Sequence, residues 1–108
     1  MLFRSPSSVV VEGTTGGVSY PTLLDGISHE QVFAPAADAQ AQSELSSWRA
    51  AELRPGGRAF FIGTEDYVGT CDAVAEARAA YEASRGLGFS PYATDASAGQ
   101  RVACYWPF

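Results

Sequence analysis

The sequence predicts a mainly α-helical fold with one short apolar segment that resembles a strand. Three observations support this prediction: apolar residues recur at helical spacing, alanine is abundant, and one compact apolar run, residues 58–63, separates the helical stretches. At 108 residues the chain fits one small domain or part of a larger one. Its 46% apolar content is sufficient for a buried core.

The first 17 residues are predicted to be an extended segment. Residues 6–19 are rich in Ser, Thr and Gly around three consecutive valines that start at Val9, a pattern typical of a short strand or a linker between turns. Residues 1–5 read Met-Leu-Phe-Arg-Ser, which matches the translation of a common sequencing-adapter end, so we interpret them as an assembly artefact. The helical, lid-like region is expected to span residues 18–108.

Two helices are expected before the apolar run. Pro21 suits the first position of a helix, and the apolar residues after it lie three to four positions apart as far as Val32. Pro35 ends this pattern. Residues 36–53 form the second predicted helix, because strong helix formers dominate and the larger apolar side chains share one side. An Arg-Pro-Gly-Gly sequence follows it and stops it.

Two further helices are expected after the apolar run. The run itself, Arg58 to Gly63, is the best candidate for a buried strand. Thr70 is the predicted N-cap of the third helix and Gly86 its predicted C-terminal cap. A last helix is expected from about Thr94 to Ala103, ended by Pro107.

The charge and hydropathy of the chain exclude two classes of partner. Twelve acidic and seven basic residues give a net charge of −5, spread along the sequence. Such a chain would be repelled by a phosphate backbone, so we expect no nucleic-acid partner. No apolar stretch approaches the roughly 20 residues of a transmembrane helix, so we expect no membrane span.

One serine lies in a sequence close to a catalytic motif. Residues 17–21 read Gly-Val-Ser-Tyr-Pro, which approaches the G-x-S-x-G elbow that exposes a nucleophilic serine. Ser19 would be the nucleophile, with His29, the only histidine, as its base. Pro21 stands where the motif needs a small glycine, so a solvated turn is the favoured interpretation of Ser19. A surface position is favoured for His29.

Acidic and aromatic residues offer two further candidate sites. Glu65 and Asp66 form an adjacent carboxylate pair, but neighbouring residues point in different directions. The acid pairs of glycoside hydrolysis usually come from separate elements, so a polar loop is the favoured interpretation. Trp48, Trp106 and the tyrosines could stack on a sugar, although at helical spacing such residues more often pack in a core. No residue is therefore assigned a catalytic or cofactor-binding role.

The chain has two cysteines, Cys71 and Cys104, with 32 residues between them. They allow one disulfide, and two buried thiols that pack as small apolar side chains are an equally good interpretation. A metal site needs three or four convergent ligands, which one histidine and two distant cysteines do not suggest. The sequence thus predicts neither a metal nor a cofactor.

Residues 90–107 resemble a segment of the tripeptidyl-aminopeptidase-like α/β-hydrolases. In that family a Ser-Pro helix leads to a Cys closely followed by Trp-Pro, and this chain has Ser-Pro at 90–91 and Cys-Tyr-Trp-Pro at 104–107. An Ala-Ile-x-Cys-x-Asp stretch and an acidic helix precede that segment in the family. Residues 59–64 and 70–85 occupy the corresponding places, with Ile and Thr where the family has Cys and Asp.

The resemblance implies that the chain is an internal lid fragment of a secreted serine hydrolase. The parent would take a peptide or a small ester or amide as substrate, and the lid would shape its pocket and limit water access. The catalytic triad would lie on both sides of the fragment, so no catalytic residue is carried over and the chain alone is expected to be inactive. The aromatic ending at 104–108 is interpreted as a break just after the lid. Arg58, Glu65 and Asp66 could contact a charged substrate end, with ordinary surface charge favoured.

Two other interpretations stay open. Residues 43–53 and 69–89 also resemble an actinobacterial glycosidase-like barrel family, in which an Ala-rich helix ends at Leu-Gly-Phe-Pro and a strand with an acidic residue follows at once. Residues 92–100 are polar and helix-like, which counts against this match. The third interpretation is a small noncatalytic helical module whose exposed Trp106 and Phe108 bind a partner. The sequence leaves the oligomeric state open.

Overall fold

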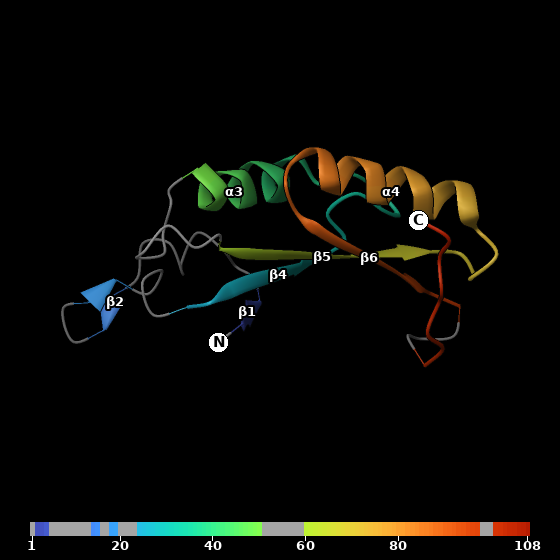
Figure 1. Cartoon of the computed structure of the whole chain (residues 1–108), viewed down its shortest axis with the longest axis horizontal. Coiled ribbons are helices and arrows are strands. Elements are labelled where there is room, and N and C mark those ends of the chain that lie inside the picture. Colours follow the sequence, from blue (N-terminus) through green and yellow to red (C-terminus); the bar gives the residue numbers. More distant parts are fainter. Residues whose placement is uncertain (1, 5–13, 16–17, 20–23, 51–59, 98–100) are drawn as a thin grey trace.

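The computed structural model describes residues 2–4, 14–15, 18–19, 24–50, 60–97 and 101–108. Four parallel strands form one sheet in the order β1-β4-β5-β6, and two helices cover one face of it (Figure 1). The elements are β1 (Leu2–Arg4), β4 (Gly26–Glu30), α3 (Ala39–Ala50), β5 (Phe61–Val68), α4 (Val74–Gly86) and β6 (Ser90–Asp95), together with a small antiparallel pair, β2 (Thr14–Thr15) and β3 (Val18–Ser19). The prediction of a mainly α fold is wrong, because the chain forms a small α/β fold.

Two consecutive β-α-β units supply three of the four strands of the main sheet. β4 leads through α3 to β5, and β5 leads through α4 to β6, with each strand parallel to the next. Crossovers of the same hand between consecutive neighbours lay their helices on the same side of the sheet. The opposite face, here named the open face, carries no helix in the described part of the chain (Figure 1). This layered sheet replaces the helical lid expected over residues 18–108.

The helix predicted from Pro21 to Val32 is wrong where the structure describes it. Residues 21–23 lie outside the described residues, and Gly26–Glu30 forms β4. Leu24, Ile27 and Val32 are buried together in the core, which explains why they are apolar. Apolar residues three to five positions apart fit a short buried strand with flanking turns as well as they fit a helix.

The helix predicted from Thr94 to Ala103 is also wrong in its described part, because Ser90–Asp95 forms β6. The strand contains Pro91, and proline is uncommon inside strands. β6 is an edge strand of the sheet, however, and proline is tolerated on edge strands because its missing N–H is not needed there. Residues 98–100 lie outside the described residues.

Two predicted helices and the predicted strand are confirmed, with different ends. α3 lies within the predicted helix 36–53 but begins at Ala39, and the Asp38 carboxylate accepts a hydrogen bond from the Ala41 N–H (3.0 Å), as an N-cap does. α4 begins at Val74 rather than next to Thr70, whose hydroxyl instead accepts the Asp72 N–H in the preceding turn. The apolar run at 58–63 extends into an eight-residue strand, Phe61–Val68.

Two apolar clusters fill the space between the sheet and the helices. The cluster beneath α3 joins strand, loop and helix residues: Leu24, Ile27, Val32, Leu45, Trp48, Phe60, Ile62 and Phe89. The cluster beneath α4 contains Val68, Ala77, Tyr81 and Ala93, with Trp106 and Phe108 packed against it. Trp48 is fully buried, and its ring stacks on Phe60 with centroids 4.8 Å apart. The core therefore lies wholly on the helix-covered face.

Truncation of Trp48 is expected to test this core. The Trp48→Ala substitution should lower the free energy of unfolding by about 3 to 5 kcal/mol, because it leaves a cavity beneath α3. The matched Trp48→Phe variant keeps a ring to stack on Phe60 and should cost clearly less. Chemical denaturation followed by circular dichroism measures both, and equal losses for the two variants would contradict the packing described.

Candidate functional site

Side chains alternate between the two faces along β5, and this alternation separates its two neighbouring carboxylates. Ile62, Thr64 and Asp66 are buried on the helix-covered face, where the Thr64 and Ser84 hydroxyl oxygens lie 2.7 Å apart. Glu65 therefore lies on the open face and Asp66 beneath the helices. The expectation that these neighbours point in different directions is confirmed, whereas the polar loop expected for them is wrong because both belong to a strand.

Three polar side chains share one row on the open face. The register pairs Glu30 of β4 with Glu65 of β5, and Glu65 with Tyr92 of β6. Paired residues on neighbouring parallel strands point to the same face, about 4.8 Å apart. The two glutamates therefore come from adjacent strands and point to the same face, with Tyr92 on the strand at the other side of Glu65.

Aromatic rings flank this row of carboxylates. Phe61 is 43% exposed and Tyr92 36% exposed, and both lie on the open face with Tyr67. Gly63 shares that face, and a Cβ placed there would lie 3.1 Å from the Phe61 ring. Glycine thus lets the Phe61 ring lie close against the strand backbone. The open face combines two carboxylates with flat apolar surfaces.

Asp66 holds the loop that follows β4. Its Oδ1 atom accepts hydrogen bonds from the Phe33 N–H (2.6 Å) and the Ala34 N–H (3.0 Å), and its side chain is 1% exposed. The Gln31 N–H also donates to the Glu65 carbonyl oxygen (2.8 Å). These bonds fix the chain immediately after Glu30, so they position its carboxylate at the end of β4.

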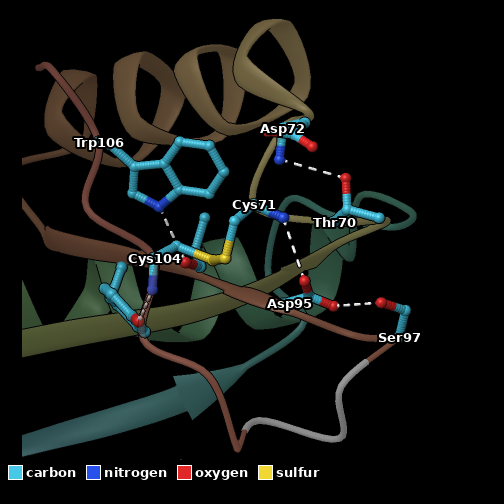
Figure 2. Close-up of a disulfide and its surroundings, with 9 residues drawn as sticks. Thr70, Cys71, Asp72, Asp95, Ser97, Cys104 and Trp106 are labelled. Atoms are coloured by element: carbon cyan, nitrogen blue, oxygen red, sulfur yellow. Dashed lines mark hydrogen bonds between the residues drawn. A yellow bond between two sulfur atoms is a disulfide. The ribbon is translucent and has the colours of Figure 1, made fainter.

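A disulfide joins Cys71, in the turn before α4, to Cys104 (Figure 2). Of the two interpretations that the sequence leaves open, one disulfide or two buried thiols, the disulfide is therefore the correct one. The Asp95 carboxylate lies beside the bridge, where its Oδ2 atom accepts the Cys71 N–H (3.1 Å) and its Oδ1 atom accepts the Ser97 hydroxyl (2.6 Å). The sulfur atoms of both cysteines and a carboxylate oxygen of Asp95 all lie within 4.8 Å of one another.

The segment at 101–108 is also attached by contacts other than the disulfide. The Cys104 N–H donates to the Tyr92 hydroxyl (3.1 Å), and the Trp106 indole N–H donates to the Ala93 carbonyl (2.9 Å). Phe108 packs edge-on against Tyr81. Trp106 and Phe108 are therefore packed onto α4 and β6, which contradicts the exposed aromatic surface expected for a noncatalytic module.

Of the serine-histidine pair considered from the sequence, the structure describes the side chain of the histidine alone. Ser19 belongs to β3, whose side chains lie outside the described part of the chain. His29 lies on β4 in register with Thr64, so it points to the face opposite to Glu30. Its Nδ1 atom lies 2.7 Å from the Glu30 carbonyl oxygen. The proposed base is thus held on the helix-covered face.

Other sequence candidates take structural positions or lie outside the described residues. Trp48 is a core residue rather than part of a sugar platform, and Arg58 lies outside the described residues.

The sequence does not single out Glu30 as a site residue, because the stretch around it is predicted to be a helix. One sequence signal could have identified Glu30: it ends a short segment that contains an isoleucine, and ligand sites of parallel sheets gather at the carboxyl ends of strands.

Within the described residues, no helix is long and apolar enough to span a membrane.

Removal of the Asp66 carboxylate is expected to release the loop after β4. The Asp66→Ala variant should lose at least about 2 kcal/mol of stability, because two buried hydrogen bonds to a charged group disappear. Amide exchange at Phe33 and Ala34 should also become faster, as measured by NMR. Glu82→Ala, a charge removal on the exposed side of α4, should stay within about 0.5 kcal/mol of the parent. Unchanged exchange at Phe33 in Asp66→Ala would contradict the role assigned to Asp66.

Comparisons of this chain with protein-family models, with curated proteins and with solved structures find no match.

Proposed function

We propose that the open face binds a saccharide and that Glu30 and Glu65 form the carboxylate pair of a retaining glycoside hydrolase. The observation that carries the proposal is the register, which puts these two glutamates on adjacent parallel strands and on the same face. Glycosidases use two carboxyl groups that flank the scissile bond, one as an acid and base and one as a nucleophile. Both glutamates are partly accessible, as such a role requires.

The separation of the two strands supports the retaining mechanism. Neighbouring strands lie about 4.8 Å apart, and retaining enzymes place their two carboxyl groups about 5 to 5.5 Å apart. Inverting enzymes need about 6.5 to 9.5 Å, which leaves room for a water molecule between carboxylate and sugar. Residues in register on adjacent strands match the shorter distance better.

The aromatic residues beside the carboxylates supply the binding surface that a sugar needs. Sugars present apolar C–H faces that pack on aromatic rings, and the exposed Phe61 and Tyr92 rings lie on the same face as the acid pair. Ser28 and Ser90 share that face in register with Gly63 and add hydroxyl groups. The open face thus offers both stacking and polar contacts.

The arrangement of strands also supports the glycosidase-like alternative considered from the sequence. Consecutive parallel strands with all helices on one side are the arrangement found in part of a β/α barrel, whose helix-free face points inward. The objection to that resemblance was that residues 92–100 are helix-like. Residues 90–95 instead form a strand directly after the Leu-Gly-Phe sequence, and this strand carries the acidic Asp95.

The proposed reaction runs in two steps. One glutamate carboxylate attacks the anomeric carbon while the other, in its acid form, gives its proton to the leaving glycosidic oxygen. The bond to the leaving group breaks as the glycosyl-enzyme bond forms. A water molecule then loses its proton to the second glutamate and attacks the same carbon, which releases the sugar and restores both carboxyl groups.

The secreted serine-peptidase function remains a prediction that nothing in the described residues tests.

Substitution of each glutamate tests the proposal. The full chain should hydrolyse at least one member of a panel of 4-methylumbelliferyl glycosides and of β-1,4-linked glucose and N-acetylglucosamine oligosaccharides. Glu30→Gln and Glu65→Gln should each lower kcat by a factor of about 100 to 10,000, because each removes a group that transfers a proton or forms the covalent bond.

Two controls keep the result interpretable. Glu82→Gln, on the exposed side of α4, should leave the rate unchanged. Circular dichroism should show that the Glu30 and Glu65 variants keep the fold of the parent. Absence of hydrolysis across the panel, or full activity in both glutamine variants, would refute the proposal.

A further inference from the structure

A second group of chemically reactive side chains lies outside the open-face site. Cys71, Cys104 and Asp95 come from the turn before α4, the segment at 101–108 and the end of β6. Their potential ligand atoms all lie within 4.8 Å of one another. Figure 2 shows the Asp95 carboxylate directed toward the turn that carries Cys71. In the oxidised chain the two sulfur atoms are bonded to each other and cannot bind a metal as thiolates.

The three residues are held together by contacts that do not need the disulfide. Asp95 accepts the Cys71 N–H, so the turn stays attached to the end of β6. On the other side, the Cys104 N–H donates to the Tyr92 hydroxyl and the Trp106 indole donates to the Ala93 carbonyl. Both contacts anchor the segment at 101–108 to β6. Reduction of the disulfide therefore leaves both thiols beside the same carboxylate.

We propose that the reduced chain binds one zinc-type divalent cation through the Cys71 and Cys104 thiolates and the Asp95 carboxylate. Thiolates and carboxylates are ordinary ligands of such cations, and two sulfur ligands favour a borderline or soft ion over magnesium or calcium. Three protein ligands leave a fourth position for water or another ligand. The site is independent of the function proposed for the open face.

The environment of Asp95 suits a metal ligand. Asp95 is 7% exposed, and the Ser97 hydroxyl and the Cys71 N–H each donate to one of its oxygens. A carboxylate oxygen that accepts a hydrogen bond can also be a metal ligand, since ligating carboxylates are themselves hydrogen-bonded. Hydrogen bonds of this kind orient metal ligands and strengthen binding. Cys104 is 5% exposed, and its burial shields one side of the site from solvent.

A phosphine can reduce the Cys71–Cys104 disulfide to two thiols in a balanced reaction. The phosphine and one water molecule convert the disulfide into two thiols, and the phosphine leaves as its oxide. Binding of the cation then displaces one proton from each thiol, because the thiolate is the form that coordinates. The site is thus present only in the reduced chain.

The test is a titration of the full chain with Cd²⁺ and with Zn²⁺ before and after phosphine reduction. The reduced chain should bind one equivalent of Cd²⁺ and develop the ultraviolet thiolate-to-cadmium charge-transfer band. Zn²⁺ should displace the Cd²⁺ and abolish this band, while the oxidised chain should show no band. Cys71→Ser and Cys104→Ser should each lose stoichiometric binding.

Asp95→Asn should weaken binding at least about tenfold, since even a change in the groups that support a ligand has an effect of that size. The matched control is Asp72→Asn, which removes the carboxylate next to Cys71 in sequence and should bind as the parent does. Circular dichroism should show that the reduced chain, with one equivalent of Cd²⁺, keeps its strands and helices. A reduced chain that binds no cation, that fails to fold even with Cd²⁺, or that is unaffected by Asp95→Asn would overturn the assignment.

Discussion

The alternation of side chains along β5 is the constraint on which the rest of this structure depends. One set of side chains, from Phe60 to Val68 in steps of two, packs beneath α3 and α4 and forms the core. The other set, which includes Glu65, has no described helix above it. Because β4 and β6 flank β5 in parallel register, the same division extends across the sheet. Stability is thus concentrated on one face, and accessible carboxyl and aromatic groups on the other.

The carboxyl ends of the strands are fixed by side chains from that same alternating pattern. Asp66 binds the loop after β4, and Asp95 binds the turn after β5. The disulfide then ties that turn to the segment at 101–108. Two buried aspartates and one bridge therefore hold the loops around the strand ends without contributing to the open face. This arrangement explains why Glu65 and Asp66, although adjacent in sequence, have different environments: Glu65 is partly exposed on the open face, and Asp66 is buried and holds a loop.

Helices and strands with strong local sequence patterns could be predicted from the sequence. Strands whose conformation depends on their neighbours in the sheet could not. The helices at 39–50 and 74–86 and the strand after residue 58 carry strong local patterns, and these were confirmed. The sequence predicts helices at Gly26–Glu30 and at the end of Ser90–Asp95, because short local patterns fit a helix as well as a strand, and only the neighbouring strands of the sheet distinguish the two states. The pairing of Glu30 with Glu65 depends on the register between strands 35 residues apart, which no local pattern reveals. The disulfide could be named as one of two alternatives, but its neighbour Asp95 could not.

The function proposed for the open face requires Glu30, Glu65 and Tyr92 to form one saccharide-binding row. Its most direct test is an NMR titration of the isotopically labelled chain with N-acetylglucosamine and cellulose oligosaccharides, in which chemical-shift changes are mapped by residue. We expect saturable changes centred on Glu30, Glu65, Tyr92 and the Phe61 ring, with α3 and α4 unaffected. Saturable changes confined to the helices, or no saturable change with any of these sugars, would contradict it.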